Sequence, residues 1–334
     1  MSFARRPADP AAHAAQLAER LIAGDRRALA RAITLVESRH PQDQAAAEAL
    51  LQQILPATGK AIRIGISGTP GVGKSSFIER FGTYLTGQGH RVAVLAIDPS
   101  STLSGGSILG DKTRMEKLAR DPNAFIRPTP SGGSLGGVAR RTREAMLLTE
   151  AAGFDVVLVE TVGVGQSETT VAGMVDIFLL LLAPAGGDDL QGIKRGIMEL
   201  ADLIVINKAD GDLLKPARLA AADYRMALHL MRPRHAEWMP QVRLASALLN
   251  EGIDEVWSVI GDYRAALEKT GAWQAQRRAQ AEAWLMRELQ DGLLDLLQSD
   301  PQIAQELPKL QKAVGAGKTT PSAAARRLLA MLRR

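Results

Sequence analysis

The chain has 334 residues, of which 46% are hydrophobic, and a formal net charge of +5. This length predicts one large domain with extensions, or two domains, and the hydrophobic share is that of an ordinary soluble protein. Because there is no cysteine, disulfides and thiolate metal sites are excluded, and we expect a cytoplasmic protein. Basic and acidic residues alternate along most of the chain, so we expect the basic excess to serve a nucleotide and acidic partners, with no nucleic acid as a ligand.

Three regions follow one another. Residues 11–55 carry apolar positions at helical spacing, which predicts two or three short helices. From residue 61, short apolar runs alternate with helical segments; the runs are AIRIGIS (61–67), RVAVLAI (91–97), NAFIR (123–127), FDVVLVE (154–160), DIFLLLLA (176–183), ADLIVIN (201–207) and QVRLAS (241–246). Such a pattern indicates an α/β fold, a mostly parallel sheet with helices on both faces. We therefore predict an N-terminal helical extension at 1–60, an α/β domain at 61–261 and a helical C-terminal extension at 262–334.

The longest apolar run, IFLLLLAPAGG at 177–187, is far shorter than the roughly 20 residues of a membrane helix. It predicts a buried strand, and we expect no membrane segment. The C-terminal helices carry a leucine stripe together with Trp273 and Trp284. They either pack on the main domain or form a dimerisation arm. The reason for the second alternative is that two terminal helices alone bury little of such a stripe.

A phosphate-binding loop follows the first predicted strand. The segment GTPGVGKSS matches the pattern G-x-x-x-x-G-K-S/T, lies after a strand and opens a helix; its residues are Gly68, Thr69, Pro70, Gly71, Val72, Gly73, Lys74, Ser75 and Ser76. The glycines let backbone N–H groups face the phosphates of a nucleotide. We expect Lys74 to bridge the β- and γ-phosphates and the Ser75 hydroxyl to bind Mg²⁺.

Acidic side chains at strand ends are candidates for the same Mg²⁺ site. Asp98 follows one apolar run and Glu160 ends another, just before TVGVGQ, where Gly163 matches the glycine of a D-x-x-G switch. Asp111, in a segment rich in Gly and Ser, is a third candidate for metal binding and catalysis. Each acid can instead be a helix cap, and the Gly/Ser-rich segment can be a surface loop or a switch.

The base is predicted from Asn207-Lys208-Ala209-Asp210, which follows a buried strand. The carboxylate of Asp210 can accept hydrogen bonds from N1–H and the exocyclic amine of guanine, whereas adenine offers neither donor. Asn207 would hold the loop, and the stem of Lys208 would cover the ring. The segment Ser246, Ala247 and Leu248 ends the next strand, where a backbone N–H can meet guanine O6. The sequence therefore predicts a protein that binds GTP and GDP.

Hydrolysis needs an oriented water and a cation. Val164 stands where Ras-like proteins have the catalytic glutamine, and Gln166, two residues later, is the substitute that we predict. Lys194 and Arg195 lie in GGDDLQGIKRG (186–196) and can supply the cation when a partner orders this segment, which can also be a plain strand-to-helix connection. We predict slow intrinsic hydrolysis that a partner accelerates.

Several motifs together resemble one family. The segments GTPGVGKSS, AIDPSS, GGSILGDKTRM, LGGVARRTREAMLL, VETVGVGQSE, DDLQGIKRGI and NKAD are similar to those of the methylmalonyl-CoA mutase-associated GTPases, called MeaB in bacteria and MMAA in animals, and also ArgK. The resemblance is dense over residues 15–262.

This resemblance implies a P-loop fold of the SIMIBI class and a homodimer formed through the C-terminal extension. It implies binding to an adenosylcobalamin-dependent acyl-CoA mutase, cofactor loading from a cobalamin adenosyltransferase, and protection or reactivation of the mutase. By motif position, Asp98, Asp111 and Glu160 match magnesium and switch residues, and Lys194 falls in the segment that couples partner binding to hydrolysis.

Three alternatives stay open at this point. A nickel or cobalt metallochaperone belongs to the same fold class, but such proteins carry motifs rich in His or Cys, and this chain has five histidines and no cysteine. A kinase or transport ATPase conflicts with the guanine motif. A regulatory binding module without useful hydrolysis is compatible with Val164.

Overall fold

The computed structural model describes residues 10–38, 40–98, 115–130, 135–161, 167–184 and 195–331. Its helices and strands, in chain order, are α1 (Pro10–Ile22), α2 (Arg26–Val36), α3 (Pro41–Ile54), η1 (Leu55–Ala57), β1 (Ile62–Gly68), α4 (Lys74–Gly87), β2 (Val92–Asp98), α6 (Glu116–Arg120), β3 (Ala124–Pro130), α7 (Leu135–Ala151), β4 (Val156–Thr161), α8 (Ser167–Ala172), β5 (Ile177–Leu182), α10 (Arg195–Met198), β6 (Leu203–Ile206), η4 (Gly211–Leu213), α11 (Leu214–His229), β7 (Gln241–Leu244), α12 (Ile253–Thr270), α13 (Ala272–Ser299), α14 (Pro301–Gly315) and α15 (Pro321–Met331).

The chain divides into two compact units, residues 1–277 and 278–334. The boundary falls inside α13, whose first turns belong to the first unit. The three domains expected from the sequence, with boundaries after residues 60 and 261, remain a proposal.

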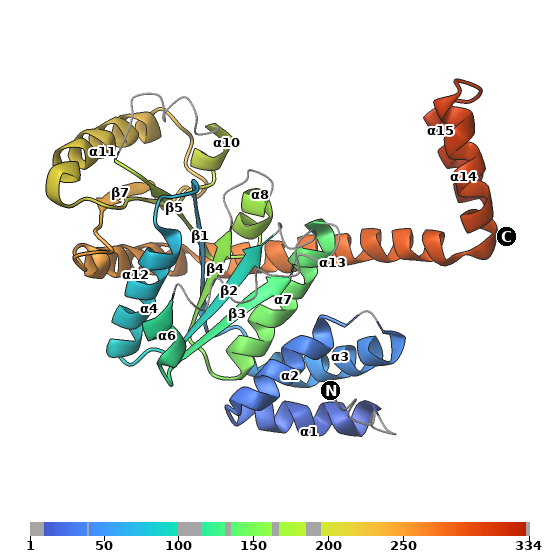
Figure 1. Cartoon of the computed structure of the whole chain (residues 1–334), viewed down its shortest axis with the longest axis horizontal. Coiled ribbons are helices and arrows are strands. Elements are labelled where there is room, and N and C mark those ends of the chain that lie inside the picture. The colour runs from blue at the N-terminus through green and yellow to red at the C-terminus, as the bar shows by residue number, and fades with distance from the viewer. Residues whose placement is uncertain are drawn as a thin grey trace. The chain divides into compact units, whose positions relative to one another are not determined.

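The first unit is built on a seven-stranded sheet of order β3-β2-β4-β1-β5-β6-β7, and every neighbouring pair of strands is parallel (Figure 1). The predicted parallel α/β sheet is thus confirmed, and each of the seven apolar runs forms one strand. The central strands β4, β1 and β5 are buried along their length, apart from the half-buried Arg63. Burial on both faces explains why their sequences are continuously apolar.

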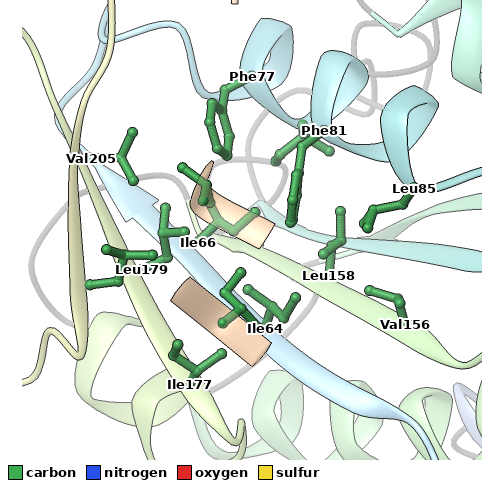
Figure 2. Packing of buried hydrophobic residues seen from close by; sticks show 14 of the residues in the cluster. Ile64, Ile66, Phe77, Phe81, Leu85, Val156, Leu158, Ile177, Leu179 and Val205 are labelled. Atoms are coloured by element: carbon green, nitrogen blue, oxygen red, sulfur yellow. The ribbon is translucent and has the colours of Figure 1, made fainter. Parts of the chain in front are cut away.

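Helices cover both faces of this sheet. On one face α4 and α12 pack against alternate residues of β1, β4 and β5. Figure 2 shows Phe77 and Phe81 of α4 lying on Ile64 and Ile66 of β1. Both phenylalanines are fully buried, and burial of a side chain of this size contributes about 1.5–3 kcal/mol.

The opposite face is covered by α7 and α8 at one side and by α10 and α11 at the other. The N-terminal helices α1, α2 and α3 pack outside α7 in the same apolar cluster. Asp25 starts α2, because its carboxylate accepts hydrogen bonds from the N–H groups of Arg27 and Ala28. The N-terminal helices are therefore part of the core of the first unit.

A buried ion pair joins the first turns of α13 to the amino ends of the strands. Arg277 donates from Nε to Asp176 Oδ1 at 2.7 Å and from Nη2 to Asp176 Oδ2 at 2.6 Å. It also donates to the backbone carbonyls of Gly59 and Ala61, at 2.6 Å each. The guanidinium stacks on Trp273, 5.1 Å from the ring centre. These contacts fasten the last residue of the first unit to the sheet.

The second unit consists of the remainder of α13 with α14 and α15. Asp300 starts α14 by accepting from two backbone N–H groups, and Arg327 of α15 pairs with Glu306 of α14 at 2.8 Å. In this part of α13 large apolar side chains are exposed, namely Leu285, Met286, Leu289, Leu293, Leu294 and Leu296. Among the described residues, no helix combines the length and the apolar character needed to cross a bilayer.

Candidate functional site

The phosphate-binding loop connects β1 to α4 at the carboxyl edge of the sheet. The strand ends at Gly68, and α4 begins at Lys74, immediately after Gly73. Gly73 has a φ of +91°, and a Cβ on this residue would lie 2.8 Å from Nδ2 of Asn207. Glycine is strongly favoured there, since a side chain would strain the left-handed backbone and would displace the Asn207 amide group. The loop thus leaves the N–H groups at the start of α4 open to an anion.

Lys74 lies folded over this loop. Its Nζ donates to the carbonyl of Gly68 at 2.7 Å and to that of Thr69 at 3.2 Å. Partial burial lowers the pKa of Lys74 below its ordinary value, and the nearby carboxylates of Glu160 and Glu168 oppose this effect. The ammonium group is therefore held close to the loop, where it can exchange the two carbonyls for phosphate oxygens.

Ser75 and Glu160 form the part of the predicted metal site that the structure describes. Glu160 is buried at the end of β4, and the Ser75 hydroxyl of α4 donates to its Oε1 at 3.4 Å. A hydroxyl and a carboxylate that converge beside a phosphate loop are the oxygen donors that Mg²⁺ prefers. The residues present fit a magnesium ion.

The other predicted catalytic and metal residues lie outside the described part. Asp98 ends β2, which is paired with β4, but its side chain is outside the description. The same holds for the whole of Asp111, Gln166 and Lys194. Their roles stay predictions.

Glu168 is a candidate that the sequence analysis did not identify. It lies in the first turn of α8, is fully buried, and its charge acts on Lys74. A fully buried carboxylate whose charge acts on the loop lysine is a candidate for holding Lys74 in place. Glu168 belongs to no recognised motif and stands at no characteristic spacing from one, so the sequence alone does not identify it.

The predicted guanine site is joined directly to the phosphate loop. Asn207 donates from Nδ2 to the carbonyl of Val72 at 2.9 Å, and its Oδ1 accepts from the N–H of Ala247 at 3.3 Å. Lys208, which has a φ of +60°, donates from Nζ to the carbonyl of Gly71 at 2.7 Å. The three loops around residues 72, 207 and 247 therefore form one hydrogen-bonded unit.

Asp210 and Ser246 face each other in this unit. The Ser246 hydroxyl donates to Oδ2 of Asp210 and accepts from the N–H of Leu249 at 3.0 Å. This contact orients the carboxylate and leaves its second oxygen available for a base. Leu248, by contrast, is 74% exposed. Nine predicted phosphate-loop residues and six predicted base-site residues thus lie at one edge of the sheet.

The sequence is similar to those of known proteins. The sequence profile of the family described as "Methylmalonyl Co-A mutase-associated GTPase MeaB" matches residues 29–302. The GTPase ArgK of Escherichia coli is 55% identical over 283 residues, which are 85% of this chain and 86% of that protein. The mouse protein named methylmalonic aciduria type A homolog, mitochondrial, is 50% identical over 319 residues, 92% of this chain and 77% of that protein.

A solved structure is similar over the full length of both chains. It is described as that of an LAO/AO transport system kinase, has 43% sequence identity to this chain and superposes with a TM-score of 0.77.

Proposed function

The chain belongs to the methylmalonyl-CoA mutase-associated GTPase family, and we propose that it acts as a chaperone of an adenosylcobalamin-dependent acyl-CoA mutase. In this proposal the protein binds GTP with Mg²⁺, hydrolyses it slowly alone and faster with the mutase. Hydrolysis is coupled to loading of the cofactor, delivered by a cobalamin adenosyltransferase, and to protection or reactivation of the mutase. The family match over residues 29–302 is the observation that carries the proposal.

We propose the following division of roles. The N–H groups at the start of α4 and the ammonium of Lys74 bind the phosphates. Asp210, oriented by Ser246, accepts from guanine. Ser75 and Glu160 would hold Mg²⁺, which neutralises charge on the phosphate oxygens when it is bound. Gln166 orients the water and Lys194 supplies the cation, as predicted from the sequence.

Phosphate release from GTP, measured with and without a cobalamin-dependent acyl-CoA mutase encoded in the same genome, tests this function. We expect a slow rate with GTP, a rise when the mutase is added, and no release from ATP. Glu160→Ala should lose Mg²⁺-dependent hydrolysis in both conditions. An unchanged rate with every such mutase would contradict the chaperone role, while equal rates with GTP and ATP would contradict the base assignment.

A second candidate is a kinase, because the similar solved structure is described as a transport system kinase. The same assay distinguishes the two functions when the fate of the γ-phosphate is followed with labelled GTP. A GTPase releases inorganic phosphate, whereas a kinase transfers the label to an acceptor.

We also propose that the protein is a homodimer joined by the C-terminal helices, and that it acts in the cytoplasm. The dimer is supported by the row of exposed apolar side chains on α13 within the second unit, since such a row is typical of an interface. Sedimentation of the wild type and of Leu289→Asp tests it, and a wild-type monomer would contradict it. Cell fractionation tests the location.

A further inference from the structure

Two buried hydroxyl groups join β1 to β4 directly behind the nucleotide site. Thr161 Oγ1 donates to Ser67 Oγ at 2.8 Å, and the two residues are 0% and 1% exposed. Ser67 immediately precedes Gly68, the first residue of the phosphate loop, and Thr161 immediately follows Glu160. The pair therefore connects the two chain segments that carry the predicted phosphate and metal contacts.

Apolar side chains dominate the side of the sheet on which the pair lies, where α8 also buries the carboxylate of Glu168. Side chains alternate along a strand, so Ser67 and Thr161 face the side of the sheet on which α8 packs, as Val157 and Val159 do. A Cβ built on Gly65, two residues before Ser67, would meet Val171, Val175 and Phe178 at 3.0 Å each. Replacing both hydroxyls by apolar groups of the same shape would change stability little, whereas removing one leaves the other buried without this partner.

Glu160 lies on the opposite side of the same strand. Its carboxylate faces α4, where it accepts from the Ser75 hydroxyl at 3.4 Å, while β4 stays in register with β1 through the pair Ile66 and Glu160. One peptide separates Glu160 from Thr161. A hydrogen bond that fixes Thr161 against β1 therefore also fixes the position and direction of Glu160 relative to the phosphate loop.

We propose that the Ser67–Thr161 hydroxyl pair is a positioning element that holds the Glu160 carboxylate opposite Ser75 for a magnesium ion bound with GTP. This inference rests on the role of Glu160 proposed above. Neither hydroxyl touches the nucleotide or the metal ion in this arrangement. Their effect passes through the end of β4, since a small misplacement of a ligand or catalytic group can lower a rate by roughly 100-fold.

Thr161→Val and Ser67→Ala each remove one hydroxyl without adding volume that the core must accommodate. We expect the Mg²⁺ concentration for half-maximal GTP hydrolysis to rise roughly tenfold in both variants, less than the loss from a full 1 Å displacement. The affinity for a GTP analogue with a fluorescent group on the ribose should fall by a similar factor in Mg²⁺ and stay at the wild-type value in EDTA. Thr161→Ser, which keeps a hydroxyl, should retain most of the wild-type response.

Thr149→Val is the matched control, because Thr149 is also fully buried and donates to the carbonyl of Met146 at 2.8 Å within α7. It should leave the Mg²⁺ response unchanged even if it lowers the melting temperature. A wild-type Mg²⁺ response in both Thr161→Val and Ser67→Ala, or an equal loss in Thr149→Val, would overturn the inference.

Glu160→Gln distinguishes a failure of the hydroxyl pair from a failure of the role proposed for Glu160. If this variant loses the Mg²⁺ response while both hydroxyl variants keep it, the hydroxyl pair has no positioning role and the proposed role of Glu160 stands. If Glu160→Gln itself keeps the wild-type response, the proposed role of Glu160 fails, and the inference fails with it.

Discussion

Replacing Arg277 by alanine should strongly destabilise the first unit. The change removes four hydrogen bonds of 2.6–2.7 Å, two to Asp176 and one each to Gly59 and Ala61. The side chains of Arg277 and Asp176 are 17% and 1% exposed. In the variant the Asp176 carboxylate stays buried, with the N–H of Arg63 as a remaining donor at 2.8 Å.

The expected magnitude follows from this burial. Removing one partner of a buried ion pair costs about 3–5 kcal/mol, because it leaves an uncompensated charge. The four hydrogen bonds share one guanidinium, so their separate contributions do not add to this figure. A loss of about 4 kcal/mol is a large part of the roughly 5–15 kcal/mol by which domains are stable. Adding Asp176→Asn to Arg277→Ala should recover part of it, since the buried charge disappears.

Urea unfolding followed by circular dichroism measures this loss, with Arg264→Ala as the control. Arg264 also stacks on Trp273, 5.4 Å from the ring centre, but its ion pair with Glu268 is about two-fifths exposed. An exposed pair contributes roughly 0–1 kcal/mol. If Arg277→Ala lowers the free energy of unfolding by no more than Arg264→Ala does, the buried ion pair stabilises the protein no more than the exposed one.

Three further predictions concern binding and pH. Asp210→Asn should weaken GTP binding in titration calorimetry by at least tenfold, since a hydrogen bond to a charged group contributes roughly 1.5–3 kcal/mol; undiminished affinity would refute the base assignment. Gly73→Ala should abolish GTP binding, because its Cβ meets Asn207, whereas Gly71→Ala should lose less, because only its φ of +80° is unfavourable; equal losses would show that the contact with Asn207 is unimportant. Burial raises the pKa of Asp202 from 3.8 to about 6, opposed by Arg234, so the folded state holds this proton more tightly than the unfolded state does. The stabilisation of the folded state that comes from protonated Asp202 is complete below pH 4, and it is lost as the pH rises through 6. Between pH 4 and pH 7 the wild type should therefore lose up to about 3 kcal/mol more than Asp202→Asn, and equal pH dependence of urea unfolding would contradict this.

The parallel sheet was predictable because burial on two faces makes each strand a short, continuous apolar run. The order of the strands was not, since a run such as 177–182 is equally apolar whichever neighbour it pairs with. The similar solved structure, at 43% identity, confirms the SIMIBI-type P-loop fold implied by the resemblance. Arg277 gave no sequence signal, because an arginine in an amphipathic helix is most often solvated.

The candidate site also has parts that could be predicted from the sequence and parts that could not. The phosphate loop and the guanine motif are contiguous segments whose residue types follow from the chemistry of one ligand, so they can be recognised locally. The hydrogen bond from Asn207 to Val72 joins two residues that are 135 positions apart in the sequence. It depends on β1, β5 and β6 being neighbours in the sheet. Glu168 and the Ser67–Thr161 pair are ordinary residue types whose importance comes from burial, which no local pattern records.

The bond between Asn207 and the phosphate loop also bears on how such a protein can be recombined. Consider a chimera that takes its first strand and phosphate loop from one relative and its later strands from another. The carbonyl of residue 72, the missing side chain at residue 73 and the side-chain amide of residue 207 then come from different proteins, although they must fit together. The crossover point itself can lie in a surface segment far from all three. Exchanging only one of the two loops can therefore give a sheet that folds but a nucleotide site whose groups do not fit. The phosphate loop and the loop at residue 207 should be taken from the same relative.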